Sequence, residues 1–455
     1  MIVSFLAPLL LAFASAPKAL VQEAEAWDQG YTVDATPAVL PYRDRAEIEN
    51  RILRDRLDNL LPELMHEADL DMWLVICREY AEDPVYLTLV PSPVFAARRT
   101  TILVFHDRGE EGVERLTVSR YGQGDFYKSA WEEGGSLDEQ WARLGEVVAE
   151  RNPERIGINV SEGWATADGL SSGLHARLTE ALGPELSDRT FSAENLIIRW
   201  LETRTAMELE VYPQLVHIAR SVIAEAFSEK VITPGVTTTA DVRWWIRDRF
   251  EELGLDLWFQ PAGNVQRMGW PAAEGSVIEG HSDAIIQRGD LLHTDVGIHY
   301  LRLCTDTQEM GYVLRPGEAN VPEGLKRAMA IGNRWQDLLT TSFELGRTGN
   351  EILAATRAKA DAEGITCSVY THPLGFHGHG TGPTIGMWDN QGPTPLRGDW
   401  PLHADTCYAI EGNVTVPITE WDGQAVQIKL EQDAWFDGEQ VHYIGGRQTQ
   451  WHVVR

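Results

Sequence analysis

Apolar and polar residues alternate along the first part of the chain in patterns that predict both strands and helices. Residues 43–68 and 137–151 carry apolar side chains at helical spacing. Apolar runs at 71–78, 100–107 and 155–161 are typical of strands. Strands that alternate with helices in this way favour a mixed sheet with helices packed against it.

The second part of the pattern begins with long amphipathic helices. Their apolar positions recur every three or four residues, and a Pro-Gly pair at 234–235 separates the first two. We therefore expect four helices, over 206–227, 239–253, 323–343 and 348–364.

The stretch 289–311 lies between these helices and predicts two adjacent apolar strands, or one long bent strand, joined near Gly297. Asp295 ends the first run, and Asp306 lies in the second, eleven residues later. A carboxylate in apolar surroundings is expensive to desolvate unless a cation neutralises it. Two aspartates aimed at one spot suggest a metal ion. Two strand aspartates that face water are the alternative at this point.

Composition and charge narrow the classes of partner. The 455 residues, 43% of them hydrophobic and 24% charged, are enough for two or three domains. The formal charge of −29 repels nucleic acid and anionic membranes, so we expect neither as a partner. Four scattered cysteines give neither a disulfide framework nor a zinc-finger spacing.

The N-terminus resembles a secretory signal. Residues 2–16 form an apolar run that ends in small residues, and cleavage after Ala16 or Ala26 fits them, although no Lys or Arg precedes the run. We expect 1–26 to be a signal peptide and leader of an exported protein, periplasmic or secreted. A buried N-terminal segment of a cytoplasmic protein is the alternative. No other run approaches the roughly 20 apolar residues of a membrane span, so we expect no stable span.

Three histidines, His372, His377 and His379, cluster among glycines in the stretch 371–389. Histidine is the commonest metal ligand, and glycine lets the backbone turn sharply or approach closely. On a strand, His377 and His379 would point to the same face. A glycine-rich surface loop with incidental histidines is the alternative.

Two glutamates complete a possible ligand set. Glu411 lies in one apolar run, and Glu431 ends an alternating strand. With Asp295, Asp306 and one histidine they form an ordered series of four carboxylates and an imidazole, all at strand-like positions. Such a set suits two divalent cations about 3.5–4 Å apart, whose charge would offset that of the carboxylates. Oxygen-rich ligation favours Mn²⁺, with Zn²⁺, Co²⁺ or Fe²⁺ as alternatives.

This half of the chain resembles the pita-bread metallopeptidases, the family of methionine aminopeptidase, aminopeptidase P and prolidase. That family carries the same ligand types in the same order, with two aspartates eleven residues apart in a GD-x-x-x-x-D-x-G context. Four segments carry the resemblance: 289–297 with Asp306, then 378–382, 410–412 and 429–432. The resemblance implies Asp295, Asp306, His379, Glu411 and Glu431 as metal ligands.

The first part of the chain resembles the N-terminal domain of the creatinase, prolidase and aminopeptidase P branch. The expected fold class is therefore α/β (α+β). A creatinase-like domain over 38–195 would precede a pita-bread catalytic domain over 196–455.

The histidine pattern departs from that family. The family has a second histidine seven residues after its ligand histidine, but Gly386 occupies this position when counted from His379. His377 is an alternative ligand. His372 resembles an upstream active-site histidine of the family, and His281 resembles its proton-handling histidine.

The resemblance implies hydrolysis of short peptides before proline, as in an Xaa-Pro aminopeptidase or dipeptidase. A metal-bridging hydroxide would attack the scissile carbonyl, Glu411 would take its proton, and His281 or His372 would stabilise the oxyanion. His377 would contact the substrate or orient a ligand. A homodimer is the assembly that we consider. The alternatives are a metal-dependent lyase, another hydrolase of C–N bonds in small molecules, and a binding module without catalysis.

Overall fold

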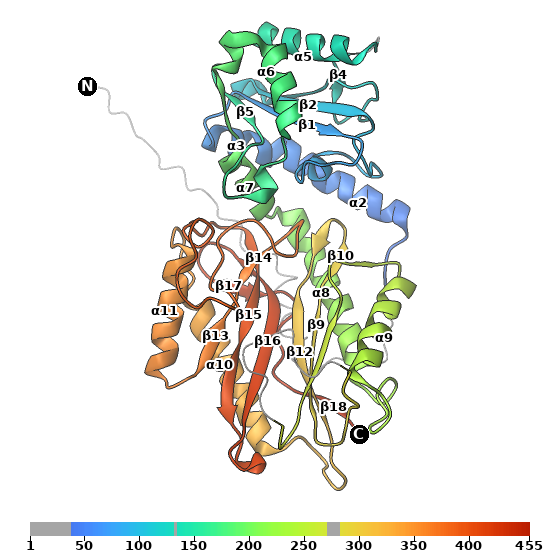
Figure 1. Cartoon of the computed structure of the whole chain (residues 1–455), viewed down its shortest axis with the longest axis vertical. Helices are drawn as coiled ribbons and strands as arrows, with labels where there is room; N and C mark the ends of the chain where they lie inside the picture. Colours follow the sequence, from blue (N-terminus) through green and yellow to red (C-terminus); the bar gives the residue numbers. More distant parts are fainter. Residues whose placement is uncertain (1–37, 132–133, 271–282) are drawn as a thin grey trace, which may run out of the picture.

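The computed structural model describes residues 38–131, 134–270 and 283–455. The predicted leader at 1–26 and His281 lie outside these residues, so both stay predictions. The described residues form two lobes, one above the other in Figure 1.

The N-terminal lobe is built on a mixed sheet whose described strands follow the order β4-β3-β2-β1-β5-β6. These strands are β1 (Met72–Arg78), β2 (Thr100–Asp107), β3 (Val113–Thr117), β4 (Lys128–Ser129), β5 (Ile156–Ile158) and β6 (Thr190–Ser192). Its helices are α2 (Tyr42–Asp55), α3 (Leu61–Glu67), α4 (Tyr86–Leu89), α5 (Leu137–Arg151), α6 (Ser172–Ser187) and α7 (Glu194–Glu202). A π-helical turn, η1 (Arg56–Leu60), joins α2 to α3.

Both faces of this sheet are buried, which explains the continuous apolar run at 72–77. Alternate side chains of β1 belong to two different cores, one containing Trp73 and the other Leu74. The predicted helices at 43–68 and 137–151 and the predicted strands are confirmed. The strand predicted over 155–161 is shorter than expected.

The C-terminal lobe is built on a larger sheet with the order β13-β15-β16-β12-β9-β8 among the described residues. Its strands are β8 (Ala262–Gln266), β9 (Leu291–Val296), β12 (Thr307–Val313), β13 (Cys367–Val369), β15 (Thr406–Pro417) and β16 (Ala425–Phe436). Three short strands pair with this path: β14 (His372–Leu374) with β15, β17 (Val441–Tyr443) with β16, and β18 (His452–Val454) with β12. A separate small sheet contains β7 (Asp256–Leu257), β10 (Ile298–Tyr300) and β11 (Leu303–Cys304).

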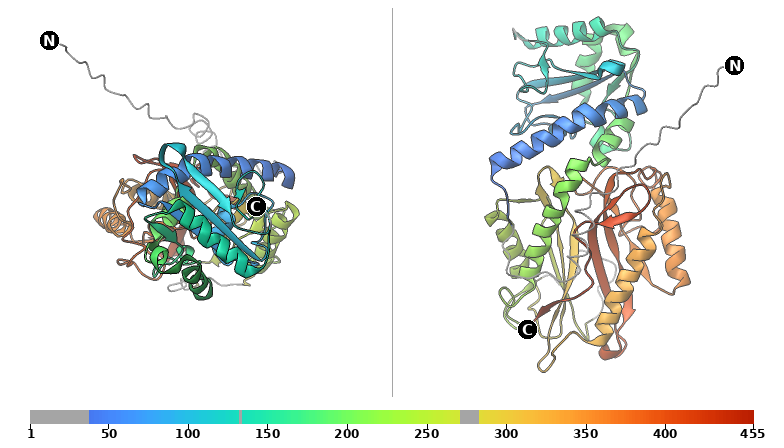
Figure 2. Two further views of the ribbon diagram at one scale, coloured as in Figure 1. Left: turned by 90° about the horizontal axis from the view of Figure 1, so that it is seen from above. Right: turned by 180° about the vertical axis from the view of Figure 1, so that it is seen from behind.

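The four predicted helices of this lobe are confirmed as α8 (Ala206–Ala226), α9 (Thr239–Glu252), α10 (Glu323–Thr340) and α11 (Gly349–Ala362). In Figures 1 and 2, α8 and α9 lie beside β8, β9 and β12, whereas α10 and α11 lie beside β13, β15 and β16. Each pair packs on its own apolar core. The carboxylate-bearing strands therefore lie in the middle of the lobe.

Three of these helices begin with capping boxes, in which the side chains of the first and fourth residues bond each other's backbone N–H groups. The pairs are Thr205 with Glu208, Thr238 with Asp241 and Thr348 with Glu351. No helix among the described residues is long and apolar enough to cross a membrane. The four cysteines are free thiols.

A buried ion cluster joins the two lobes. Arg56 of the N-terminal lobe and Arg204, just before α8, both pair with Glu208, at 2.7 and 2.9 Å. All three side chains are about 1–2% exposed. Both guanidinium groups also lie over the ring of Phe376, in the loop that carries His377 and His379. The junction therefore contacts the histidine segment directly.

Candidate metal centre

Four acidic side chains come together on adjacent strands of the C-terminal sheet. Asp295 of β9 lies opposite Gln308 of β12, Gln308 lies opposite Glu431 of β16, and Glu431 lies opposite Glu411 of β15. These four residues form one row across the sheet. Asp306 precedes Gln308 by two residues and joins the same group. The sequence-predicted carboxylates are therefore brought together.

The backbone at Asp306 is held by a buried carboxylate that the sequence analysis did not single out. Asp433 of β16 accepts hydrogen bonds from the Asp306 N–H at 3.0 Å and from the Thr307 hydroxyl at 3.1 Å. Its side chain is fully buried. Asp433 thus fixes the point at which the chain enters β12.

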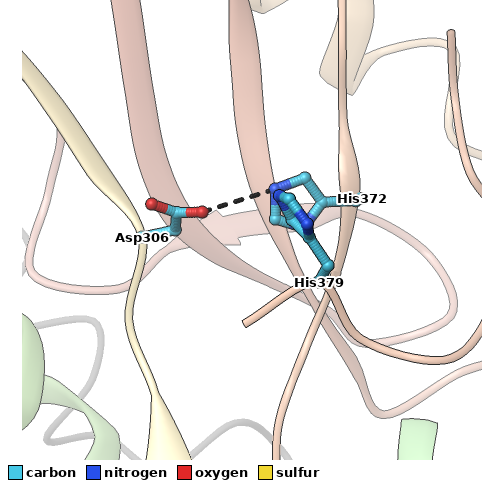
Figure 3. A group of neighbouring side chains, drawn as sticks. All are labelled: Asp306, His372 and His379. Atoms are coloured by element: carbon cyan, nitrogen blue, oxygen red, sulfur yellow. Dashed lines mark ion pairs between the residues drawn. The ribbon is translucent and has the colours of Figure 1, made fainter. Parts of the chain in front are cut away.

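His372 places a ring nitrogen among these carboxylates (Figure 3). Its Nε2 lies 3.4 Å from Asp306 Oδ2, 3.7 Å from Glu431 Oε1 and 3.8 Å from Glu411 Oε2. The short strand β14, paired with β15 so that His372 faces Ala409, holds the ring there.

The protonation of His372 suits a metal ligand. Its Nδ1 lies 3.1 Å from the carbonyl oxygen of Pro373, which can only accept a hydrogen bond. Nδ1 is therefore the protonated nitrogen. Burial lowers the pKa of His372 to about 3, so the ring is neutral and Nε2 presents a lone pair to the carboxylates.

The other two histidines lie in an irregular loop, so the prediction that they share a strand is wrong. The strand ends at Leu374, and residues 375–379 form bends. Gly380 folds back to donate a hydrogen bond to Pro373 at 2.7 Å, which a strand would not permit. His377 and His379 therefore do not point to the same face of one strand.

His379 and His377 differ in their distance from the centre. The ring of His379 lies 4.6 Å from that of His372, and its Nε2 is 3.3 Å from the Tyr370 hydroxyl. His379 can form a possible ligand group with Asp306 and His372. His377 belongs to no such group among the described residues. His379 lies seven residues after His372, which is the spacing expected between the ligand histidine and the second histidine of the resembled family.

The unpaired atoms of this centre fit cations. Among the described residues, Asp295 Oδ1, Asp306 Oδ1, both carboxylate oxygens of Glu431 and Nε2 of His372 are buried without a hydrogen-bond partner. Buried polar atoms normally have partners, so this concentration points to a missing positive charge. Three overlapping ligand groups have donor atoms within 4.8 Å of one another.

Electrostatics agree with this interpretation. Burial, with mutual repulsion, raises the pKa values of Asp306, Glu411 and Glu431 well above those of ordinary carboxyls. Burial raises the pKa of Asp295 to about 7. Lys429, only 7% exposed, offsets part of this charge through Asp295 and Glu411. One ammonium cannot neutralise four carboxylates, so this group of side chains fits the charge of divalent cations.

A buried amide chain orients Glu411. Gln308 donates through Nε2 to Glu411 Oε1 at 2.7 Å, and its own Oε1 lies 2.8 Å from Nε2 of His293. Both residues lie two positions from a predicted aspartate and so share its strand face. The sequence analysis missed them, although this spacing was the signal that could have found them.

A cavity of about 620 Å³ opens beside the carboxylates. Asp295, Asp306, Glu411 and His379 line one part of it. Aromatic side chains line much of the rest: Trp244, Trp258, Phe259, Tyr370 and Trp388. A small substrate in this cavity would lie against the possible metal ligands.

The comparisons with known proteins agree with this geometry. Residues 212–435 match the model of metallopeptidase family M24. No curated protein sequence matches the chain.

Several solved structures share the fold. An X-Pro aminopeptidase from Thermotoga maritima has 17% identity and a TM-score of 0.61, covering 86% of this chain and 100% of its own. An Xaa-Pro dipeptidase from Bacillus anthracis has 16% identity and a TM-score of 0.57, covering 91% and 100%. A prolidase from Pyrococcus furiosus has 16% identity and a TM-score of 0.55, covering 85% and 99%. Residues 212–435 thus belong to metallopeptidase family M24, and the chain shares the pita-bread fold of these aminopeptidase and prolidase structures.

Proposed function

We propose that the protein is a dinuclear metal-dependent Xaa-Pro aminopeptidase or dipeptidase. The observation that carries this proposal is the convergence of four buried carboxylates and Nε2 of His372 beside a substrate-sized cavity. The peptide-bond preference comes from the similar solved structures, an X-Pro aminopeptidase and an Xaa-Pro dipeptidase.

Two ions would be held by groups that share Glu431. One group contains Asp295, Asp306 and Glu431, and the other contains His372, Glu411 and Glu431. We propose His372 as the histidine ligand in place of His379, because its neutral tautomer presents a buried lone pair to three carboxylates. Oxygen-rich ligation favours Mn²⁺, with Zn²⁺, Co²⁺ or Fe²⁺ also compatible.

Divalent ions bound here would supply a hydroxide near neutral pH and polarise the scissile carbonyl. The chain's own residues would position the proton and the substrate. Glu411 keeps Oε2 available to accept a proton, because Oε1 already accepts a hydrogen bond from Gln308. His379 and Tyr370 line the cavity and can donate hydrogen bonds to the carbonyl oxygen as it gains charge.

A substrate panel with metal analysis tests the proposal. We expect close to two divalent ions per chain after reconstitution with Mn²⁺, and cleavage of Xaa-Pro dipeptides and tripeptides. Matched peptides with alanine in place of proline should react more slowly. Turnover of small amides or elimination substrates in place of every peptide would instead support a lyase or another C–N hydrolase. Failure to bind any divalent ion would contradict the dinuclear centre.

A further inference from the structure

The cavity has an apolar wall that metal binding does not require. Trp258 forms the centre of this wall, with its ring 4.4 Å from that of Phe259 and 5.1 Å from that of His379. Both contacts are edge-to-face, an arrangement favourable for aromatic pairs.

Trp258 is held in place by the same segments that carry the acidic ligands. Its Nε1 donates to the Thr305 carbonyl at 2.9 Å, one residue before Asp306. A side chain at Gly297 or at Gly378 would overlap its ring, because a Cβ there would lie 2.0 or 2.1 Å from ring atoms. Glycine at both positions lets the backbone approach the indole closely. Trp258 is therefore held in place by a hydrogen bond and by close backbone packing.

Two further tryptophans leave much of their surface open to solvent. Trp244 of α9 is 58% exposed, and Trp388 is 45% exposed. Both line the same cavity as Trp258. Exposed aromatic surface gathered around one cavity is a feature of ligand-binding sites, since such surface is unfavourable in water.

The described lining residues offer few cationic side chains that could pair with a negatively charged group of the substrate. Arg243 is the only Lys or Arg among them, and its guanidinium already pairs with Asp283 at 2.9 Å. The aromatic wall is thus suited to a large uncharged group.

We infer that the site selects substrates whose Xaa residue, on the acyl side of the scissile bond, has a large apolar or aromatic side chain. This inference rests on the proposed function, because proline then fixes the other side of the bond. Trp244 and Trp388 would lie against the Xaa side chain, while the scissile carbonyl lies beside Asp306 and Glu411.

Specificity constants for Phe-Pro and Gly-Pro, measured on the Mn²⁺-loaded protein, test the inference. We expect kcat/KM to be about 10- to 100-fold higher for Phe-Pro, the range that burial of one apolar side chain provides. Trp244→Ala and Trp388→Ala should each reduce this ratio while metal content stays at the wild-type level. Leu345→Ala, which removes an equally exposed side chain (58%) of the same lobe, should leave the ratio unchanged. A wild-type ratio near one, or a high ratio retained in both tryptophan variants, would overturn the inference.

A binding measurement separates this inference from the proposed function. Calorimetry with phenylalaninamide and glycinamide should show tighter binding of phenylalaninamide, and Trp244→Ala should remove the difference. If no Xaa-Pro peptide is cleaved but this preference is observed, the proposed function is wrong and the aromatic subsite stands. Equal binding of the two amides would reject the subsite.

Discussion

Two fully buried charged regions of this molecule differ in how their charges are balanced. At the lobe junction, Glu208 pairs with Arg56 and Arg204, and backbone carbonyls accept further hydrogen bonds from both guanidinium groups. In the C-terminal sheet, four carboxylates face one another with Lys429 as the nearby cation. The junction is close to satisfied by protein groups, whereas the carboxylate centre is not.

This difference separates a structural site from a functional one. A buried ion cluster whose members find partners within the protein acts on stability, and removal of one partner is strongly unfavourable. A cluster with several unpartnered atoms around one point needs a ligand from outside the chain. Variants in the two regions should therefore affect different measurements.

The largest effect is expected from Asp306→Ala. This change removes a carboxylate that belongs to two of the three possible ligand groups. We expect metal content to fall by at least one ion per chain and kcat/KM to fall roughly 1,000-fold or more, a loss at least as large as that of an oxyanion donor. Metal analysis of the purified protein checks this result. The exposed Asp256→Ala is the matched control and should keep both ions. Full metal content in Asp306→Ala would show that the residue is not a ligand.

At the junction, Glu208→Ala should lower stability and leave metal content unchanged. It leaves Arg56 and Arg204 buried without their carboxylate, a change that typically costs about 3–5 kcal/mol. Burial already lowers the pKa of Arg56 to about 10. Urea unfolding measures the loss. Glu351→Ala breaks an equivalent capping box on an exposed helix end and should produce a much smaller change. Equal losses of unfolding free energy in the two variants would mean that Glu208 stabilises the protein through its capping box and not through the ion cluster.

The two regions also differ in how far the sequence could predict them. Asp295, Asp306, Glu411 and Glu431 were found because strand periodicity and their order along the chain are local properties. The junction was not found, because Arg56 and Glu208 are far apart in sequence and only the packed lobes bring them together. The histidines lie between these cases. The strand on which they were expected ends at Leu374, where the glycine-rich loop begins. As a result, His372 lies on the strand beside the carboxylates, whereas His377 and His379 lie in the loop.

The histidine assignment is the next largest test. His372→Ala should reduce affinity for Mn²⁺ by about 100-fold or more, since it removes a direct ligand of the ion. His379→Ala should bind Mn²⁺ nearly as well as the wild type and lower kcat. Competition with a fluorescent chelator measures both affinities. Loss of metal only in His379→Ala would instead support the assignment made from the sequence.

A buried carboxyl in the N-terminal lobe gives a pH-dependent contrast to the centre. Burial raises the pKa of Asp83 to about 6, although Asn159 and the Val85 N–H donate hydrogen bonds to it. The folded state thus binds a proton that the unfolded state, with a pKa near 3.9, has released. Stability contributed by this residue is present at low pH and is lost as pH rises from about 4 to 6. Relative to Asp83→Asn, the wild type should lose about 1–3 kcal/mol over that window. Urea unfolding at several pH values checks the sign, and an opposite slope would contradict the assigned pKa.

The smallest expected effect concerns Gln308, whose side-chain amide lies among the carboxylates of the centre. Gln308 is a neutral residue in the row of carboxylates, and it holds Glu411 while His293 holds Gln308. Gln308→Leu keeps the approximate volume but removes the hydrogen bond to Glu411 Oε1. Because groups that orient a ligand typically contribute about 10- to 100-fold to metal affinity, we expect a loss near the lower end, about 10-fold. The protein should stay folded, since an apolar side chain replaces a buried polar one.

The matched control is Gln432→Leu, which removes a buried amide on the neighbouring strand that bonds Gln336. This variant should change metal affinity less. Equal losses in the two variants would mean that any buried amide of this sheet supports the centre, and that Glu411 needs no partner of its own.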